Sequence, residues 1–303
     1  MHAQGSSRAM ATIGFIGLGV MGRPMAANLV TAGHAVTGFS RSTATREAAT
    51  AAGIPLAESM ADAVAGADVV ITMLPDSPDV EAVALGDGGV LATIAEGATY
   101  IDMSTISPNV SRRIAEKFAA AGHPVLDAPV SGGEAGAIEG VLSIMIGGDA
   151  ATIEAQRSVL EAMGSTITHV GDAGSGQVIK AANQLVVATH LQALAEVIAF
   201  LEAQGADARA GLDAIAKGLG GSTVIDRKTA SVLAGEFGPG FRAELHDKDL
   251  RIVMDAAQSS GAVLPVTSAV AQFMRSLVAT GRGGLDHSAL VVLARELNGA
   301  AAS

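Results

Sequence analysis

Three glycines near the amino terminus have the spacing of a turn that binds phosphate groups. Gly17, Gly19 and Gly22 follow a short apolar run at residues 12–16 and precede a run with helical apolar spacing at residues 23–30. In this setting the first glycine permits a tight turn, the second lets a pyrophosphate approach the backbone, and the third lets the helix pack closely on the strand. The pattern therefore predicts a dinucleotide cofactor. The residues predicted to hold it here are Gly17, Leu18, Gly19, Val20, Met21 and Gly22.

The end of the second predicted strand bears on which nicotinamide cofactor is bound. An NAD site offers an Asp or Glu there to the ribose hydroxyls, yet no acid lies between Gly33 and Arg46. Instead Arg41, flanked by Ser40 and Ser42, presents a guanidinium and two hydroxyls that suit a 2′-phosphate. We therefore predict NADP in preference to NAD. The alternative is that Arg41 stacks on the adenine or lies in solvent.

Hydride transfer from a nicotinamide to a carbonyl carbon produces an alkoxide, which a nearby acid must protonate. Lys180 can supply that proton, and Asn183 lies on the same face if this segment is a helix. Gly176, one turn before Lys180, is expected to leave space for a ligand. Burial beside a nicotinamide would make the lysine ammonium a stronger acid. Considered alone, a lysine on a long helix is more often a solvated side chain, so this pattern leaves both interpretations open.

Polar and glycine-rich segments end other predicted strands. Residues 73–75 and 104–105 lie at the carboxyl edge of the predicted sheet, where ligands bind, and residues 131–133 could turn backbone N–H groups toward a carboxylate. Each segment is equally compatible with a simple turn. Later in the chain, Lys248 beside Asp249 offers a local cation for an acidic ligand, with a solvated ion pair as the alternative.

Short apolar runs must form the strands that position these residues. Because the runs alternate with segments of helical spacing, they predict an α/β Rossmann-type domain with a mostly parallel sheet. After Gly171 only helical patterns remain, and residues 175–204 predict one helix of ~40 Å that joins two domains. The predicted strands are residues 12–16, 35–39, 69–73, 99–102, 124–126, 143–146 and 166–169.

The predicted domain organisation has three segments. Residues 1–9 are expected to be a flexible leader, residues 10–172 an NAD(P)-binding Rossmann domain, and residues 173–303 an all-α domain for substrate binding and dimerisation. Only 16% of the residues are charged, against about 25% in an average domain. Such a low share indicates additional buried surface, so we expect a homodimer or homotetramer formed through the helical domain.

The composition excludes several classes of site. The chain has no cysteine, which removes disulfides, thiolate metal sites and cysteine nucleophiles, and its seven histidines lack metal-binding spacing, so no metal is predicted. His246 and His287 could line a cleft, although surface positions are as plausible. The net charge of −11 and 3% aromatic residues disfavour nucleic acid and anionic membranes as partners. Because the overall charge is negative, the binding of a small carboxylate substrate must depend on a few individual donor or cationic groups at the site.

The cellular location is expected to be the cytoplasm, since no segment has the composition of a membrane span. The apolar run at residues 9–22 after Arg8 loosely resembles a signal peptide. Its glycines favour the phosphate-binding turn instead.

Together these motifs resemble those of the β-hydroxyacid dehydrogenases. The resemblance extends from Thr12 to about Leu297 with the motifs in the order of that family. It implies NAD(P)-dependent oxidation and reduction of a small β-hydroxyacid and its semialdehyde. The segments that carry it are residues 16–29, 73–75, 102–105, 127–133, 176–183 and 248–249.

The resemblance also implies roles for individual residues. Lys180 corresponds to the general acid/base of the family, with Asn183 beside it. Ser131, Gly132 and Gly133 correspond to the substrate carboxylate site, together with Lys248. The remaining residues placed against the cofactor by the resemblance are Met73, Leu74, Pro75, Ser104, Thr105, Phe241, Lys248 and Asp249.

Within the family, three segments favour tartronate semialdehyde as the substrate. Residues 131–147, 221–226 and 286–290 are similar to the form found in enzymes that reduce it to glycerate. The alternative is the substrate of 3-hydroxyisobutyrate dehydrogenase or another short semialdehyde. Two other classes are an imine reductase, which usually lacks the helix lysine, and a non-catalytic NADP-binding interaction module, which would lose the acid. Lys180 counts against both.

Overall fold

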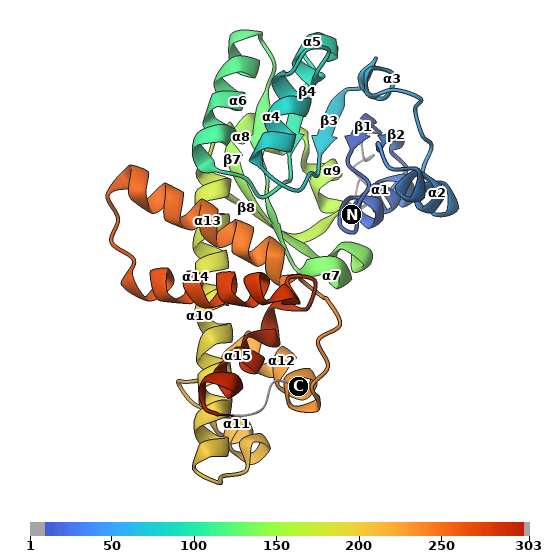
Figure 1. Ribbon diagram of the computed structural model, residues 1–303. Coiled ribbons are helices and arrows are strands. Elements are labelled where there is room, and N and C mark those ends of the chain that lie inside the picture. The colour runs from blue at the N-terminus through green and yellow to red at the C-terminus, as the bar shows by residue number, and fades with distance from the viewer. Residues whose placement is uncertain (1–9, 300–303) are drawn as a thin grey trace, which may run out of the picture. The chain divides into compact units, whose positions relative to one another are not determined.

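The computed structural model of the protein describes residues 10–299 (Figure 1). The chain forms two compact units, residues 1–180 and residues 181–303, and each has its own hydrophobic core. The expected flexible leader at residues 1–9 lies outside the described residues, as do residues 300–303.

An eight-stranded sheet forms the centre of the first unit, in the order β2-β1-β3-β4-β5-β7-β6, with β8 paired to β7. The first five strands in that order are parallel, β7 is antiparallel to β5 and β6, and β8 is parallel to β7. The strands are β1 (Thr12–Ile16), β2 (Ala35–Phe39), β3 (Val69–Thr72), β4 (Thr99–Asp102), β5 (Val125–Asp127), β6 (Val130–Ser131), β7 (Leu142–Gly148) and β8 (Gly164–Gly171).

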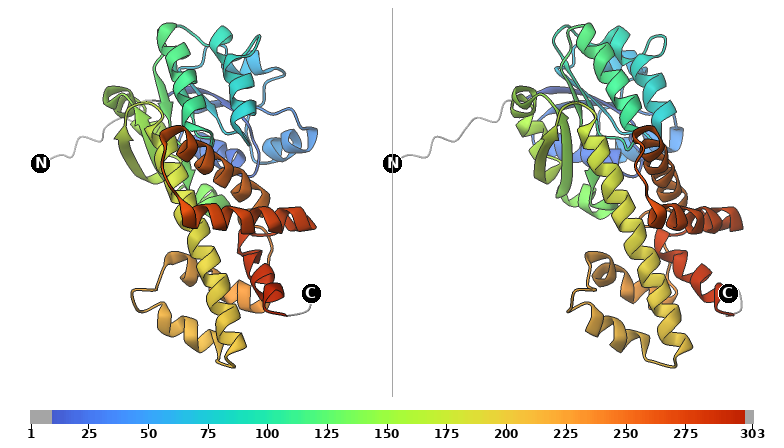
Figure 2. Two further views of the ribbon diagram at one scale, coloured as in Figure 1. Left: turned by 60° about the vertical axis from the view of Figure 1, so that its left-hand side comes forward. Right: turned by 90° about the vertical axis from the view of Figure 1, so that its left-hand side faces the viewer.

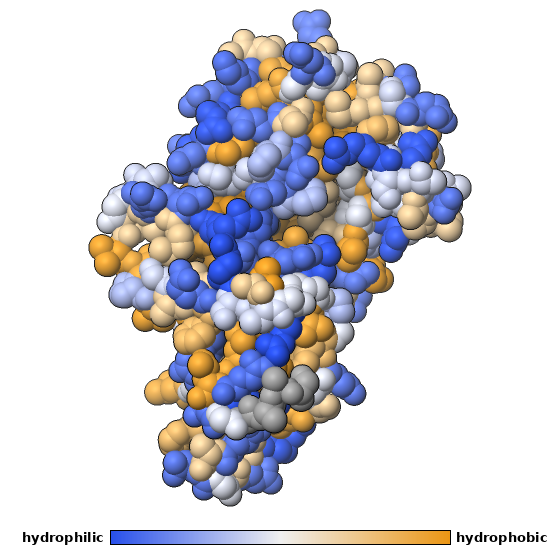
Figure 3. Space-filling model, in the orientation of Figure 1, coloured by the Kyte–Doolittle hydropathy of each residue, from blue (hydrophilic) through white to orange (hydrophobic). Residues whose placement is uncertain are grey.

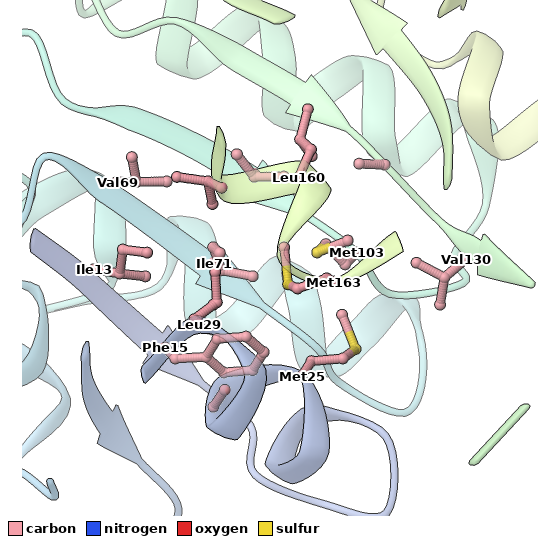
Figure 4. Close-up of a cluster of buried hydrophobic side chains, with 14 of the residues drawn as sticks. Ile13, Phe15, Met25, Leu29, Val69, Ile71, Met103, Val130, Leu160 and Met163 are labelled. Atoms are coloured by element: carbon pink, nitrogen blue, oxygen red, sulfur yellow. The ribbon is translucent and has the colours of Figure 1, made fainter. Parts of the chain in front are cut away.

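Side chains of the central strands alternate between two apolar clusters because successive residues of a strand point to opposite faces. Ile13, Phe15 and Ile71 enter one cluster (Figure 4), whereas Val70 and Tyr100 enter the other. Every residue of β3 and β4 is buried, as expected for a sheet covered by helices on both faces. The helices of this unit are α1 (Gly22–Thr31), α2 (Thr43–Ala51), α3 (Met60–Val64), α4 (Ser77–Leu85), α5 (Val90–Thr93), α6 (Pro108–Ala120), α7 (Gly133–Glu139), α8 (Ala150–Ala155) and α9 (Arg157–Glu161).

The predicted α/β Rossmann-type domain with a mostly parallel sheet is confirmed. The apolar pattern carries no information on the direction of β7. The chain between β5 and β7 contains only β6 and α7, and β6 pairs antiparallel with β7 through Val130–Ile144 and Ser131–Ser143. Because this connection returns the chain without a parallel crossover, β7 runs opposite to β5.

The second unit is entirely helical in its described part, and this prediction is also confirmed. Its core packs around the later turns of α10 (Ser175–Ala203), where Leu191, Leu194 and Ile198 are buried. Two of the helices end at glycines in the left-handed conformation, Gly235 and Gly261. The remaining helices are α11 (Ala208–Ile215), α12 (Thr223–Ala234), α13 (Ala243–Ser260), α14 (Pro265–Leu277), η1 (Val278–Arg282), η2 (His287–Ala289) and α15 (Leu290–Leu297).

Helix α10 is continuous over 29 residues (Figure 2), close to the predicted range of 175–204. Among residues 10–299 it is the one helix long and apolar enough to cross a membrane by length and composition. Its polar side chains Gln177 and Gln184 are nevertheless buried and donate hydrogen bonds to protein oxygens. Buried polar side chains that are hydrogen-bonded to protein atoms are typical of a helix packed inside a folded protein.

Candidate cofactor-binding and catalytic site

Each glycine of the predicted phosphate-binding turn is required for a different reason. Gly17 has φ +99°, and a Cβ there would lie 2.3 Å from the carbonyl oxygen of Met73. A Cβ on Gly22 would lie 1.9 Å from the carbonyl oxygen of Gly17, which shows how closely α1 packs on the turn. A Cβ on Gly19 would meet nothing within 4 Å in the described part of the chain. The backbone at Gly19 is therefore open to a ligand.

The turn fits a dinucleotide pyrophosphate. Helix α1 begins at Gly22 and, within the described residues, has no side-chain cap. Its first N–H groups and its dipole can therefore serve a phosphate that approaches over Gly19. Leu18 is buried beneath the turn, whereas Val20 is 58% exposed.

The segment predicted to select NADP lies between β2 and α2. The Ser42 hydroxyl caps α2 by accepting a hydrogen bond from the Thr45 N–H at 3.4 Å. The Arg41 side chain is 85% exposed, and its guanidinium lies 3.8 Å from the Asp79 carboxylate of α4. Arg41 is thus held at the surface by a weak ion pair that a phosphate could replace.

The structure brings three of the predicted cofactor segments together at the carboxyl edge of the sheet. Met73 follows β3 and its carbonyl oxygen faces Gly17. The next residue, Leu74, donates its N–H to the Ser104 hydroxyl at 2.9 Å. Ser104 is fully buried and precedes Thr105, while Pro75 follows Leu74. The ends of β1, β3 and β4 therefore form one continuous edge, the place where a sheet of this type binds a nucleotide.

The predicted carboxylate-binding segment connects β6 to α7. Ser131 ends β6, and Gly132 and Gly133 have φ of +141° and +67°, a conformation that favours glycine at both positions. Helix α7 begins at Gly133 and, in the described chain, has no side-chain cap. The backbone N–H groups of this turn can therefore serve as donors to a carboxylate.

Lys180 lies in the second turn of α10 and its side chain is buried, with 7% of its surface exposed. The solvated lysine considered as an alternative is therefore wrong. Three residues earlier, the Gln177 amide donates to the Ser104 carbonyl oxygen at 2.8 Å and accepts from the Ile106 N–H at 3.0 Å. The lysine helix is thus bonded directly to the chain segment that follows β4.

Gly176 does not leave space for a ligand, contrary to expectation. A Cβ at this position would lie 2.5 Å from the carbonyl oxygen of Met145 and 2.6 Å from that of Asp127. The glycine is needed because α10 begins directly against the backbones of β5 and β7.

Asp127 is a buried carboxylate that the sequence reasoning did not assign to the site. Its two oxygens accept hydrogen bonds from the N–H groups of Gly174 at 2.6 Å and Gln177 at 2.9 Å. Burial, with a smaller contribution from the Asp102 carboxylate, raises the pKa of Asp127 to about 6 despite the lowering effect of these donors. The signal in the sequence was its position directly after the predicted strand at residues 124–126.

In the second unit, Asn183, Lys248 and Asp249 belong to one hydrogen-bonded group. The Asn183 amide donates to Gln184 at 2.9 Å, and the Gln184 amide donates to Asp249. Lys248 forms an ion pair with Asp249 at 2.9 Å, and both residues are buried, with 7% and 3% exposed. A solvated ion pair is therefore wrong for Lys248 and Asp249.

Phe241 lies in a second buried group that sequence reasoning missed. Its N–H donates to Asp286 at 3.1 Å, and its ring packs edge-on against His246 and His287, which are both buried and not on the surface. Burial would raise the pKa of Asp286, but His287, Lys228 and Ser288 hold it well below its usual range. No spacing in the sequence links these residues, because they come from three separate helices and the loops between them.

Two family models match nearly the whole chain. The model described as the NAD binding domain of 6-phosphogluconate dehydrogenase matches residues 12–171, and the one described as NAD-binding of NADP-dependent 3-hydroxyisobutyrate dehydrogenase matches residues 174–294. The 2-hydroxy-3-oxopropionate reductase of Escherichia coli (strain K12) is 38% identical over 279 residues, which cover 92% of this chain and 95% of that protein. The chain belongs to the β-hydroxyacid dehydrogenase family.

Two further proteins are similar to this β-hydroxyacid dehydrogenase over most of its length. The NAD-dependent L-serine dehydrogenase of Pseudomonas aeruginosa is 39% identical over 286 residues, covering 92% of this chain and 96% of that one. A solved structure of Mycobacterium tuberculosis 3-hydroxyisobutyrate dehydrogenase with L-serine has a TM-score of 0.89 and 38% identity, and covers 95% of this chain and 100% of that chain. The predicted family and oxidoreductase class are confirmed, and the cofactor is a nicotinamide dinucleotide.

Proposed function

We propose that this β-hydroxyacid dehydrogenase reversibly reduces tartronate semialdehyde to glycerate, with NADPH as the hydride donor. The observation that carries the proposal is the buried Lys180 on a helix bonded, through Gln177, to the Ser104 segment at the carboxyl edge of the sheet. A sheet of this type binds its cofactor at that edge, so Lys180 is suited to act as an acid near the nicotinamide. The similarity to the Escherichia coli reductase supports the choice of substrate.

The proposed reaction divides the work between cofactor and protein. The nicotinamide, when bound, supplies a hydride to the aldehyde carbon. Lys180 donates its proton to the aldehyde oxygen and takes it back in the reverse reaction. Asn183, on the same helical face, orients the substrate or the lysine. The turn at residues 131–133 would hold the substrate carboxylate, which a chain of net charge −11 cannot attract by its overall field.

The proposed cofactor preference is for NADP. The backbone at residues 17–22 would hold the pyrophosphate, and Ser40, Arg41 and Ser42 would surround a 2′-phosphate. The exposed Arg41 guanidinium supports this preference, since its Asp79 partner at 3.8 Å is a weak competitor for a phosphate. The description of the second matching family model as NADP-dependent supports it as well.

A second candidate function is the oxidation of L-serine or 3-hydroxyisobutyrate. Relatives of similar identity are named for these substrates, and the solved Mycobacterium tuberculosis structure is described with L-serine. Glycerate, serine and 3-hydroxyisobutyrate share a carboxylate and a β-hydroxyl and differ at C2, which carries a hydroxyl, an ammonium or a methyl group. A pocket distinguishes such small differences by only about 1–3 kcal/mol unless a buried polar group is left unpaired.

Steady-state kinetics on a substrate panel test these proposals. The panel pairs tartronate semialdehyde, methylmalonate semialdehyde and succinate semialdehyde with NADH and NADPH, and glycerate, L-serine and 3-hydroxyisobutyrate with NAD and NADP. The variant Lys180→Ala should lose at least about a hundredfold in kcat, the scale of general acid catalysis. The control Lys217→Ala removes an exposed lysine and should retain the wild-type rate.

The outcomes separate the candidates. The highest kcat/KM with tartronate semialdehyde and NADPH supports the first function, and a higher value with L-serine supports the second. A folded Lys180→Ala protein with wild-type kcat contradicts the proposed acid.

We also propose a homo-oligomer assembled through the helical unit and located in the cytoplasm. Large apolar side chains lie exposed on this unit, and apolar surface is visible there in Figure 3. Sedimentation equilibrium of the purified protein measures the assembly, and a monomer at micromolar concentration contradicts it. In the described part of this unit, the exposed large apolar residues are Val186, Phe200, Leu219, Val263, Val266 and Leu297.

A further inference from the structure

The amino-terminal turn of the lysine helix is bonded on two sides. Asp127, the last residue of β5, accepts the N–H groups of Gly174 and Gln177 with its two carboxylate oxygens, at 2.6 and 2.9 Å. The Gln177 side chain bonds to the backbone of Ser104 and Ile106, at 2.8 and 3.0 Å. Both side chains are buried, with 3% and 1% of their surfaces exposed.

The space around Asp127 is shaped by glycines. A Cβ on Gly147 would lie 2.4 Å from one carboxylate oxygen of Asp127, and a Cβ on Gly176 would lie 2.8 Å from the other. Any side chain at position 147 or 176 would therefore collide with the Asp127 carboxylate. A buried carboxylate is costly unless donors surround it, so the helix start is fixed strongly by these bonds.

The second side chain links the helix to the predicted cofactor edge. Ser104 accepts the Leu74 N–H on its hydroxyl and the Gln177 amide on its carbonyl oxygen. Gln177 and Lys180 are three residues apart on one helix and lie on the same face. A continuous set of hydrogen bonds thus runs from the end of β3 through Ser104 to the turn that precedes Lys180.

We propose that Asp127 and Gln177 are positioning residues that fix the first turn of α10 and, through it, the place of the Lys180 amine. The inference rests on the proposed function of Lys180 as the acid. Neither residue exchanges a proton with the substrate. Their contribution is to hold the amine where proton transfer occurs, and a displacement of about 1 Å can lower the rate by about a hundredfold.

Gln177→Glu provides the first test because its effect depends on pH. When protonated, the introduced carboxyl group can donate to the Ser104 carbonyl oxygen and accept from the Ile106 N–H, as the glutamine does, whereas the carboxylate cannot donate. We expect the ratio of variant to wild-type kcat to be near one at pH 5 and to fall at least about tenfold by pH 8, with KM changed less. The other ionisable groups near this turn are present in both proteins, so their effects cancel to first order in the ratio. They are Asp102, Asp127, Asp172, Arg112 and Lys180 itself.

Two further variants complete this test. Gln204→Glu makes the same charge change at an exposed position after α10 and should give a ratio that does not vary with pH. Gln177→Met keeps the side-chain size without hydrogen bonds and should lower kcat equally at both pH values. Gln177→Met also tests the proposal if Gln177→Glu does not fold. A pH-independent ratio near one for Gln177→Glu, or wild-type kcat for a folded Gln177→Met, overturns the proposal.

Hydrogen exchange tests the anchoring without any activity. Asp127→Asn keeps the shape but offers one oxygen and one NH₂ group to two N–H donors. We expect exchange in a peptide covering residues 174–183 to increase at least about tenfold at pH 7, the loss of about one hydrogen bond. Asp149→Asn changes another helix-capping aspartate, of α8, and should leave that peptide unchanged.

The two readouts separate the possible failures. Unchanged exchange in a folded Asp127→Asn overturns the anchoring, whatever the activity. The proposed function and the catalytic part of this inference both fail if the wild-type protein reduces none of the semialdehydes and oxidises none of the hydroxyacids. In that case hydrogen exchange still decides whether the start of α10 is anchored.

Discussion

His246 and His287 face each other inside the helical unit, with 2.9 Å between their Nδ1 atoms. The Nε2 atom of His246 lies 3.0 Å from the Gln184 carbonyl oxygen, which can only accept a hydrogen bond. His246 therefore carries its hydrogen on Nε2 and, when neutral, accepts at Nδ1. It follows that His287 donates from Nδ1, so the pair has a defined direction that requires an unprotonated Nδ1 on His246.

The histidine pair predicts a loss of stability in mild acid. Burial, with a smaller contribution from His246, lowers the pKa of His287 to about 3, while Asp286 opposes them. Between pH 6.5 and 3 the unfolded chain binds a proton at this residue that the folded chain does not, so stability falls as the pH falls. From pH 7 to pH 5 this term amounts to about 2 kcal/mol.

The check is urea unfolding at pH 7 and pH 5 at constant ionic strength. His287→Gln should show a decrease in the free energy of unfolding about 2 kcal/mol smaller than that of the wild type. His190→Gln, at an exposed position of α10, should keep the wild-type decrease. The raised pKa of Asp127 acts in the opposite direction but is common to all three proteins. Equal decreases in His287→Gln and wild type would contradict the prediction.

Asp286→Ala should destabilise the helical unit by about 3–5 kcal/mol, because it leaves a partly buried ammonium without its carboxylate. Asp286 accepts both Lys228 contacts, at 2.8 and 2.9 Å, and the N–H groups of Gly240, Phe241 and Ser288. Urea unfolding measures the loss. Asp213→Ala, an exposed aspartate of α11, should change stability by less than about 0.5 kcal/mol. If Asp286→Ala is as stable as this control, the hydrogen bonds and the ion pair of Asp286 contribute little to the free energy of unfolding.

Gly19→Ala should separate cofactor binding from folding. Its Cβ meets nothing within 4 Å among the described residues, so the stability should change by less than about 1 kcal/mol. A pyrophosphate that approaches this backbone would collide with the new methyl group, and we expect the Kd for NADPH to rise at least about tenfold. Fluorescence titration with NADPH provides the measurement, with Gly238→Ala, also open at Cβ, as the control. Unchanged affinity in Gly19→Ala would place the cofactor elsewhere.

Arg41→Ala should weaken the use of NADPH and leave NADH unaffected. Loss of a hydrogen bond to a charged group costs about 1.5–3 kcal/mol, which corresponds to about 10–100-fold in the KM for NADPH. Arg227→Ala removes an exposed arginine of α12 and should change neither value. The proposed NADP preference fails if Arg41→Ala alters KM for the two cofactors equally.

Local patterns were sufficient to predict the first strands and the long helix. β1, β2 and β4 begin and end at the predicted residues, because each is a short apolar run bounded by polar or glycine residues. Residues 175–204 predict α10 closely because the segment contains no proline and only one glycine, Gly176. The direction of β7 and the existence of β6 depend on a hairpin that apolar alternation does not encode.

The site was predictable where chemistry follows a motif and not where it depends on packing. The glycines of the turn and Lys180 stand at recognisable positions in the chain. Asp127 and Gln177 are 50 residues apart, and their bond forms only when β5 ends against α10. The role expected for Gly176 was wrong for the same reason, since its neighbours come from β5 and β7.

The apolar character of α10 also has a consequence for the synthesis of the chain. This helix is completed at residue 203, whereas the last helix that covers its core ends at Leu297. About 90 residues must still be added, which takes roughly 5–20 seconds at ordinary rates of translation. Over that interval the apolar side chains in the later turns of α10 are covered only in part, because α11 to α15 are added one after another. The nascent chain therefore passes through a stage that hydrophobic-segment chaperones can recognise, and termination before α15 would make that stage permanent.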